Sequence, residues 1–215
     1  MRSLSPFTQT FDKLPNTLPV FPLTNAVVMP GGQLPLNIFE ARYLNMIQDA
    51  MDNHRLIGMV QPRTEGDNPE LYNIGCAARI TRYEETNDGR IEISLMGLCR
   101  FDISEELITT RGYRLIVPNW SKYEIDYEKQ EEPDSATQFT FMNTLRSHFK
   151  QTNMDIDWKI MEKLSTESLF NALFYFLDLS DEDKQMLIEM DTLNQRIKTI
   201  TAILDGNSQV IPTHH

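Results

Sequence analysis

The sequence predicts an α+β protein in which a β-rich half comes first and a helical half follows. Three observations indicate this order. Between residues 56 and 128, short runs alternate apolar with polar side chains, which is typical of half-buried strands. The acidic run YEIDYEKQEEPDSA, which begins at Tyr123, then has no periodic apolar face and indicates a boundary. Beyond it, apolar residues recur every three or four positions, which is the spacing of a buried helix face.

The composition fits one large domain or two small ones and argues against several classes of partner. The chain has 215 residues, of which 40% are hydrophobic and 24% charged, so it can bury a sizeable core. Its formal net charge of -11 argues against nucleic acid and against an anionic membrane surface, because both attract clustered Lys and Arg. No segment reaches the apolar length of a membrane span, and residues 1–17 lack the apolar core of a signal peptide. We therefore expect a cytoplasmic protein.

The first structured stretch contains three short apolar runs. They are Leu18–Phe21, Ala26–Met29 and, after a Pro30-Gly31-Gly32 break, Leu34–Ile38. Pro19 and Pro22 have no N–H group to donate to a neighbouring strand. We therefore expect Leu18–Phe21 to form an edge strand, with the Pro/Gly-rich residues 30–37 as a rim beside it.

The spacing then changes and predicts a helix. Its apolar face repeats at i, i+3, i+4, i+7 and i+8 and consists of Tyr43, Met46, Ile47, Ala50 and Met51. The opposite face consists of Arg42, Asn45, Asp49 and Asp52. We expect Asn37 to be the N-cap residue and Glu40, three positions later, to complete a capping box.

The next part of the chain predicts a small barrel or pseudo-barrel. A short apolar run at Leu56–Val60 is followed by the polar, turn-rich loop 63–70. Asp88-Gly89 then lies between two strand-like segments, which is a strong signal for a β-hairpin. The alternation resumes in two later segments, which lie before Pro118. Several short strands at this spacing are typical of a closed or nearly closed sheet.

The helical half is expected to form a C-terminal α-helical bundle. Ser180 opens an acidic first turn ahead of Met186 and Leu187. Asp191 is expected to cap the last helix, which ends at Asp205-Gly206. The predicted parts of the chain are an N-terminal tail at 1–17, a β-rich domain at 18–128, a helical subdomain at 129–206 and a C-terminal tail at 207–215.

The N-terminal stretch also carries the motif of a known family. The matching segments are Leu18-Pro19-Val20-Phe21-Pro22-Leu23, Met29-Pro30-Gly31, Leu34-Pro35-Leu36 and Ile38-Phe39-Glu40-Ala41-Arg42-Tyr43. Together they resemble the N-terminal domain of the Lon protease family, also called the Lon substrate-binding domain. Further segments that resemble this family are Gly75-Cys76, Ala78-Arg79-Ile80, Asp88-Gly89-Arg90, Gly97-Leu98-Cys99-Arg100-Phe101 and Gly112-Tyr113-Arg114. The resemblance implies a PUA-like six-stranded pseudo-barrel that carries one helix, and family members with a helical extension look similar.

The sequence contains no catalytic or metal-binding motif of the common kinds. It has no P-loop, no His-Glu-x-x-His, no Cys-x-x-Cys and no Gly-x-Ser-x-Gly. In Lon proteases, as the resemblance implies, the ATPase and the Ser–Lys peptidase dyad lie in further domains, and this chain ends before either. We therefore expect no enzymatic activity, no metal and no cofactor. Cys76 and Cys99 lie on predicted strands and are expected to be small buried hydrophobic residues.

Two classes of function remain open. The first is a non-catalytic binding module that recognises unfolded or extended polypeptide segments, or a protein partner such as a protease, as the resemblance implies. The second is a PUA-like small-molecule-binding protein or enzyme with a ligand at the barrel mouth. A shallow apolar groove would favour the first class, and a pocket of converging polar groups would favour the second.

The candidate binding residues are Phe39, Glu40, Arg42, Tyr43 and Arg100. Capping and helical spacing already explain Glu40 and Tyr43 structurally, whereas nothing local explains Arg42. Arg100 is expected to point outward from a strand, where it would pair with Glu40 or meet a ligand. Phe39 and Arg42 are expected to face a groove that holds an extended peptide beside the predicted edge strand.

Overall fold

The computed structural model describes residues 6–66 and 68–206, in which the chain forms two compact units. The first, β-rich unit holds the chain up to Lys129 together with Tyr175–Ile188. The second, helical unit holds the intervening segment and the chain from Glu189 onward. The predicted C-terminal tail lies outside the described residues.

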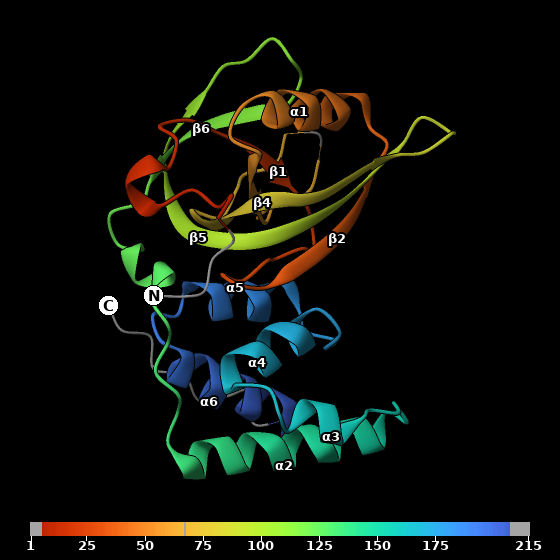
Figure 1. Ribbon diagram of the computed structural model, residues 1–215, viewed down its shortest axis with the longest axis vertical. Helices are drawn as coiled ribbons and strands as arrows, with labels where there is room; N and C mark the ends of the chain where they lie inside the picture. The colour runs from red at the N-terminus through yellow and green to blue at the C-terminus, as the bar shows by residue number, and fades with distance from the viewer. Residues whose placement is uncertain (1–5, 67, 207–215) are drawn as a thin grey trace. The chain divides into compact units, whose positions relative to one another are not determined.

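The β-rich unit is built on a six-stranded mixed sheet that curves back on itself (Figure 1). The strands are β1 (Leu18–Pro22), β2 (Gln33–Ile38), β3 (Leu56–Val60), β4 (Ile74–Glu85), β5 (Ile91–Leu107) and β6 (Arg114–Asn119). Their order is β2-β5-β4-β3-β1-β6, and β5 also pairs with β6. This extra pairing joins every strand except β2 into a closed ring. The sheet agrees with the predicted α+β class and with the expected six strands.

β1 is not the edge strand that its prolines predicted. It pairs in parallel with β3, where Val20 lies opposite Gly58, and antiparallel with β6, where Pro19 lies opposite Leu115. The prediction was wrong because a proline removes only its own donor, and the neighbouring residues still pair on both sides. In the described part of the chain the strand with a single neighbour is β2, which pairs with β5 alone.

The predicted Asp88-Gly89 hairpin is confirmed and joins β4 to β5. Gly89 has φ +83°, a conformation that glycine adopts without strain, and the Thr86 N–H donates to the Arg90 carbonyl (3.0 Å). β5 then runs for 17 residues, so that its first part pairs with β2 and β4 and its last part with β6. The pairing with β6 shifts register near Ile103, as at a β-bulge, which bends a strand.

Helix α1 (Ala41–Asp52) follows β2, and its buried face is the predicted one: Tyr43, Met46, Ile47 and Ala50. Its N-cap differs from the prediction. The N-cap residue is Glu40, whose side chain makes no capping hydrogen bond, and Asn37 lies within β2 opposite Glu92. Asn37 cannot cap the helix because pairing with β5 keeps the chain extended through Ile38.

Helix α5 (Asp181–Glu189) belongs to the β-rich unit up to Ile188, although segments of the helical unit both precede and follow it in the sequence. The Gln61 side chain donates to the Asp181 carbonyl (2.9 Å), and the Gln185 side chain donates to the Ile74 carbonyl (3.1 Å). Lys184 donates to the Asn25 side chain (2.5 Å). The predicted boundaries assign residues 175–188 to the helical subdomain at 129–206, whereas in the structure they belong to the β-rich unit.

Residues 9–15, which lie in the predicted N-terminal tail, contact the barrel. They contain a short 3₁₀ helix, η1 (Phe11–Lys13). Trp120 donates to the Pro15 carbonyl (3.0 Å), and the Tyr127 hydroxyl donates to the Gln9 carbonyl (3.1 Å). Tyr127 is buried and Trp120 is partly buried, and these bonds give acceptors to the polar ends of both side chains.

The helical unit consists of α2 (Ser135–Gln151), α3 (Trp158–Met161), α4 (Thr166–Phe174) and α6 (Leu193–Leu204). Asp134 caps α2 by accepting a hydrogen bond from the Thr137 N–H (2.8 Å). α6 is capped by Thr192, which forms a capping box with Gln195, and not by the predicted Asp191. Among the described helices, none has the length and apolar character needed to cross a membrane.

Candidate functional site

Most of the predicted binding residues lie together at the start of α1. Phe39 is 67% exposed although it is a large apolar side chain. Arg42 pairs with Glu40 at the surface (Nη2–Oε2 2.9 Å). The Tyr43 side chain is buried, and its ring packs on Phe21 with centroids 4.0 Å apart. The structural explanation therefore holds for Tyr43, whereas Phe39 and Arg42 remain at the surface.

Arg100 is not part of this group, and the expectation that it points outward is wrong. Its side chain is 1% exposed and forms an ion pair with Asp126, which lies in the 3₁₀ helix η2 (Glu124–Tyr127). Nε donates to Oδ2 (3.0 Å), Nη2 to Oδ1 (2.9 Å), and Nη1 donates to the Ile188 carbonyl of α5 (3.1 Å). Burial lowers the pKa of the Arg100 guanidinium, but the hydrogen bonds and charge of Asp126 outweigh it and raise the pKa overall. Arg100 therefore joins β5, η2 and α5 and is unavailable to a ligand.

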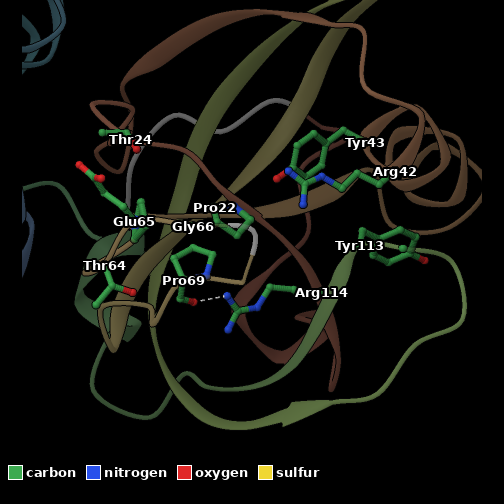
Figure 2. A pocket seen from close by; sticks show the side chains of 12 residues that line it. Pro22, Thr24, Arg42, Tyr43, Thr64, Glu65, Gly66, Pro69, Tyr113 and Arg114 are labelled. Atoms are coloured by element: carbon green, nitrogen blue, oxygen red, sulfur yellow. Dashed lines mark hydrogen bonds between the residues drawn. The ribbon is translucent and has the colours of Figure 1, made fainter.

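A pocket of about 260 Å³ lies beside Arg42 and Tyr43 (Figure 2). The walls come from four segments of the chain. They are Pro22 and Thr24 at and after the end of β1, Arg42 and Tyr43 of α1, Pro62, Thr64, Glu65, Gly66 and Pro69 of the loop after β3, and Gly112, Tyr113 and Arg114 at and just before the start of β6. In Figure 2 the Arg42 and Tyr43 side chains lie on one side of the pocket, and Thr24, Thr64 and Glu65 lie on the opposite side.

Sheet topology places these segments at the same end of the barrel. β1 and β3 are parallel, and Pro22 lies opposite Val60, so the two strands finish together. β6 is antiparallel to β1, with Val20 opposite Arg114, so β6 begins where β1 finishes. The pocket therefore occupies a barrel mouth, which is a common place for a binding site.

One carboxylate of α1 holds the β5–β6 loop beside the pocket. Asp49 accepts hydrogen bonds from Arg111 (Nη2–Oδ1 2.7 Å) and from the Tyr113 hydroxyl (2.8 Å). Between these two residues, Gly112 has φ +84°, and a Cβ atom there would lie 3.4 Å from Arg42 Cβ. The loop thus passes close over the start of α1 and forms one wall of the pocket.

Both guanidinium groups of the pocket already have carboxylate partners. Arg42 pairs with Glu40, and Arg114 pairs with Glu106 (Nε–Oε1 2.6 Å) while Nη1 donates to the Pro69 carbonyl (2.6 Å). Glu65 adds a further negative charge to the wall. The pocket is therefore not strongly cationic, and its charges do not favour a phosphate or a free carboxylate.

The walls of the pocket include two tyrosines, Tyr43 and Tyr113, whose pKa values are raised. Burial raises the pKa of Tyr43, and burial together with the hydrogen bond to Asp49 raises the pKa of Tyr113, so both hydroxyls stay protonated at neutral pH. Neither tyrosine can then act as a proton acceptor near pH 7. Within residues 6–66 and 68–206, no group of three His, Cys, Asp or Glu side chains is arranged to hold a metal ion.

Of the predicted binding residues, Arg42 and Tyr43 line the pocket, whereas Phe39, Glu40 and Arg100 do not, and the residues of the opposite walls were not predicted. Tyr113 and Arg114 were part of a recognised family segment, Gly112-Tyr113-Arg114, which was the available signal. Asp49 was placed on the polar face of the helix, but its partner Tyr113 lies 64 positions further along the chain. Only the fold brings these two residues together.

Comparison with known proteins gives a match over most of the chain. The sequence profile described as ATP-dependent protease La (LON) substrate-binding domain matches residues 17–206. Lon protease of Cytophaga hutchinsonii is 25% identical over 211 residues, which cover 93% of this chain and 25% of that protein. Lon protease of Flavobacterium johnsoniae is 28% identical over 200 residues, which cover 86% of this chain and 23% of that protein. The chain therefore spans about a quarter of the length of these curated relatives.

Solved structures share the fold. The Lon N-terminal domain protein from Xanthomonas campestris has a TM-score of 0.63 at 22% identity and covers 86% of this chain and 97% of its own. The N-terminal domain of the Mycobacterium avium complex Lon protease has a TM-score of 0.62 at 16% identity and covers 89% of this chain and 98% of its own.

Proposed function

Because this chain belongs to the LON substrate-binding domain family, we propose that it is a non-catalytic module that binds unfolded or extended polypeptide. The observation that carries the proposal is the exposure of Phe39 beside Arg42 at the start of α1. An exposed aromatic side chain next to a guanidinium is a typical anchor for a polypeptide, because it offers apolar contact and a charged hydrogen-bond donor together. We also propose that the barrel is PUA-like.

Arg42 is well placed to change partners. Its ion pair with Glu40 is about half exposed, and its guanidinium lies 4.6 Å from the Tyr43 ring centroid. A pair of this kind contributes only about 0–1 kcal/mol, so a ligand can replace Glu40 at small cost. Phe39 needs no rearrangement, because its side chain is already accessible.

Binding should be weak. An unfolded client loses conformational entropy when it is ordered on the surface, and the contact area around Phe39 and Arg42 is small. We expect dissociation constants in the micromolar range or above, which correspond to about -8 kcal/mol or weaker.

Fluorescence anisotropy tests the proposal. The probe is fluorescein-labelled α-lactalbumin, kept unfolded by reduction and alkylation of its cysteines. Phe39→Ala and Arg42→Ala should each weaken binding several-fold. Phe139→Ala is a matched control, because Phe139 is similarly exposed (69%) but lies in the helical unit. Arg82→Ala is the control for Arg42, because Arg82 also pairs with a glutamate two positions away.

Two results would contradict the proposal. If the wild-type protein does not bind the unfolded probe, the function is not that of a polypeptide-binding module. If the Phe39 and Arg42 variants keep wild-type thermal stability and bind as tightly as the controls, the binding surface lies elsewhere.

The pocket favours a second candidate function, in which the barrel mouth holds a small molecule. At about 260 Å³ the pocket lies just below the range of about 300–1,000 Å³ that is usual for such sites. Thermal shift measurements with a library of polar aromatic compounds would detect such a ligand. A compound that stabilises the wild type but not Tyr113→Ala, while polypeptide binding is unaffected by that change, would favour this second function.

A further inference from the structure

We infer that an extended client segment binds as an added strand along the free edge of β2, beside Phe39. This inference rests on the proposed polypeptide-binding function and specifies how the client is held. The ligand class is a polypeptide segment in β-conformation, recognised mainly through its backbone.

β2 is the open edge of an otherwise closed sheet. The β5–β6 pairing closes the ring through β4, β3 and β1, so each of these strands has a neighbour on both sides. β2 pairs with β5 on one side only. On its other side, no hydrogen bond from any described residue reaches the backbone of β2. An unpaired strand edge is a template for another strand.

The pairing register shows which groups of β2 point away from β5. The Gly97 N–H donates to the Gly32 carbonyl (2.9 Å), and Gln33 lies opposite Met96. In an antiparallel ladder, hydrogen-bonded pairs alternate with non-hydrogen-bonded pairs. The Gln33–Met96 pair is therefore non-hydrogen-bonded, and the N–H and C=O groups of Gln33 point to the free edge.

The same alternation applies along the rest of β2. Pro35 and Asn37 have the parity of Gln33, and the register is unbroken between them. Pro35 suits this position because its nitrogen faces the free edge. It therefore removes no hydrogen bond from the ladder with β5. The free edge thus offers the N–H groups of Gln33 and Asn37 and the carbonyl groups of Gln33, Pro35 and Asn37.

The edge carries no charge, its one protective feature being Pro35, which withholds an outward N–H, and it is continuous with the proposed anchor. The β2 sequence QLPLNI contains no charged residue, and edge strands are commonly protected by charge, especially Lys. Gln33, Pro35 and Asn37 are exposed, so a strand can approach. β2 ends at Ile38, and Phe39 follows immediately with its ring in solvent. A client strand along β2 would therefore bring a side chain to Phe39.

Proline substitutions test the inference while leaving the β2–β5 ladder in place. Gln33→Pro and Asn37→Pro each remove an outward N–H, and the double variant removes both. Gln33→Ala and Asn37→Ala are matched controls that lose the side chain but keep the N–H. With the labelled, unfolded α-lactalbumin as probe, the double proline variant should bind about tenfold more weakly or worse, equivalent to about 1.4 kcal/mol, and the alanine controls should bind within about twofold of wild type.

Hydrogen exchange of the wild-type protein, followed residue by residue by NMR, gives a second measurement that needs no variant. Unfolded client should slow exchange at the Gln33 and Asn37 amides. The Leu34 and Leu36 amides already face β5 and should change little. This measurement decides the matter if the proline variants do not fold.

The outcomes separate the inference from the function on which it rests. If folded proline variants bind like wild type, or if client leaves exchange at Gln33 and Asn37 unchanged, strand addition is refuted, while loss of binding in Phe39→Ala would still support the polypeptide-binding function. If these amides become protected at high protein concentration without client, a second copy of the chain occupies the edge and the inference is wrong. If wild type binds no unfolded probe, the proposed function itself is refuted.

Discussion

The buried ion pair between Arg100 and Asp126 predicts a large loss of stability in the variant Asp126→Asn. Asparagine keeps the size of the side chain but removes the charge that balances the Arg100 guanidinium, which is 1% exposed. In the wild type, Asp126 accepts the Arg100 backbone N–H (2.9 Å), Nε (3.0 Å) and Nη2 (2.9 Å) through its two oxygens. Asparagine has one acceptor oxygen, so at least one of these donors would face an amide N–H₂ group.

The expected cost is that of breaking a buried pair while one charge stays behind, about 3–5 kcal/mol. A typical domain has about 5–15 kcal/mol in total, so the variant would lose a large fraction of its stability. For a chain of this length each kcal/mol lowers Tm by about 2–4 °C, which gives a fall of about 6–20 °C.

Tryptophan fluorescence during urea unfolding can follow the β-rich unit alone. The chain has two tryptophans, and Trp158 lies in the helical unit. A Trp158→Phe background leaves Trp120, which packs edge-on against Phe101 in the barrel (5.8 Å between centroids). Glu84→Gln in the same background is the control, because it breaks an exposed pair with Arg82 and should cost at most about 1 kcal/mol.

The reasoning would be refuted by a small effect. If Asp126→Asn loses no more stability than the Glu84→Gln control, the folded state does not need the Asp126 charge to balance the buried guanidinium of Arg100. The double variant Arg100→Met with Asp126→Leu gives a further check. It removes both charges and should recover part of the loss, because two apolar side chains leave no uncompensated charge in the core.

Three smaller perturbations have defined outcomes. Thr192→Ala should lower the free energy of unfolding by about 0.5–2 kcal/mol in thermal unfolding, because it removes the α6 cap. Asp191→Ala should change it by no more than about 0.5 kcal/mol, and equal losses would contradict the assignment of Thr192 as the N-cap. Gly97→Ala should destabilise the barrel by about 1–3 kcal/mol in urea unfolding, because its Cβ would lie 2.1 Å from the Met29 carbonyl oxygen; a wild-type midpoint would show that the backbone relaxes freely. Hydrogen bonds from the Thr137 N–H and hydroxyl lower the pKa of Asp134. The stabilisation that Asp134 gives to α2 is therefore present at neutral pH, and it is lost as the pH falls below 3.8, the ordinary pKa of an aspartate. A pH titration of α2 helicity should therefore differ in Asp134→Ala only above that range, and identical curves would exclude the cap.

Features that depend on neighbouring residues could be predicted from the sequence. The buried face of α1 follows from helical spacing, and the Asp88-Gly89 turn follows from a glycine that adopts positive φ. The α1 cap shows where local reasoning stops. Asn37 is a good N-cap residue, but its pairing with Glu92 in the sheet outweighs that preference.

Features that depend on distant residues could not be predicted in the same way. Alternation along β5 indicated an outward Arg100, whereas Asp126, 26 positions later, covers it. The prolines of β1 indicated an edge, whereas β3 and β6 arrive from opposite sides. For the site, the sequence predicted the exposed residues at the start of α1, but the pocket walls come from loops that only the barrel brings together.

The return of Tyr175–Ile188 to the barrel affects the order in which the protein can be completed during translation. Gln61 and its partner Gln185 are 124 positions apart, which at about 5–20 residues per second corresponds to about 6–25 s of synthesis. During that interval the hydrogen-bond partners of Gln61 and of the Ile74 carbonyl, which lie in α5, have not yet been synthesised. A nascent barrel therefore lacks part of its own unit until α5 has been synthesised. A fragment that ends near Lys129 would stay in that state, because it lacks one of its own packing elements.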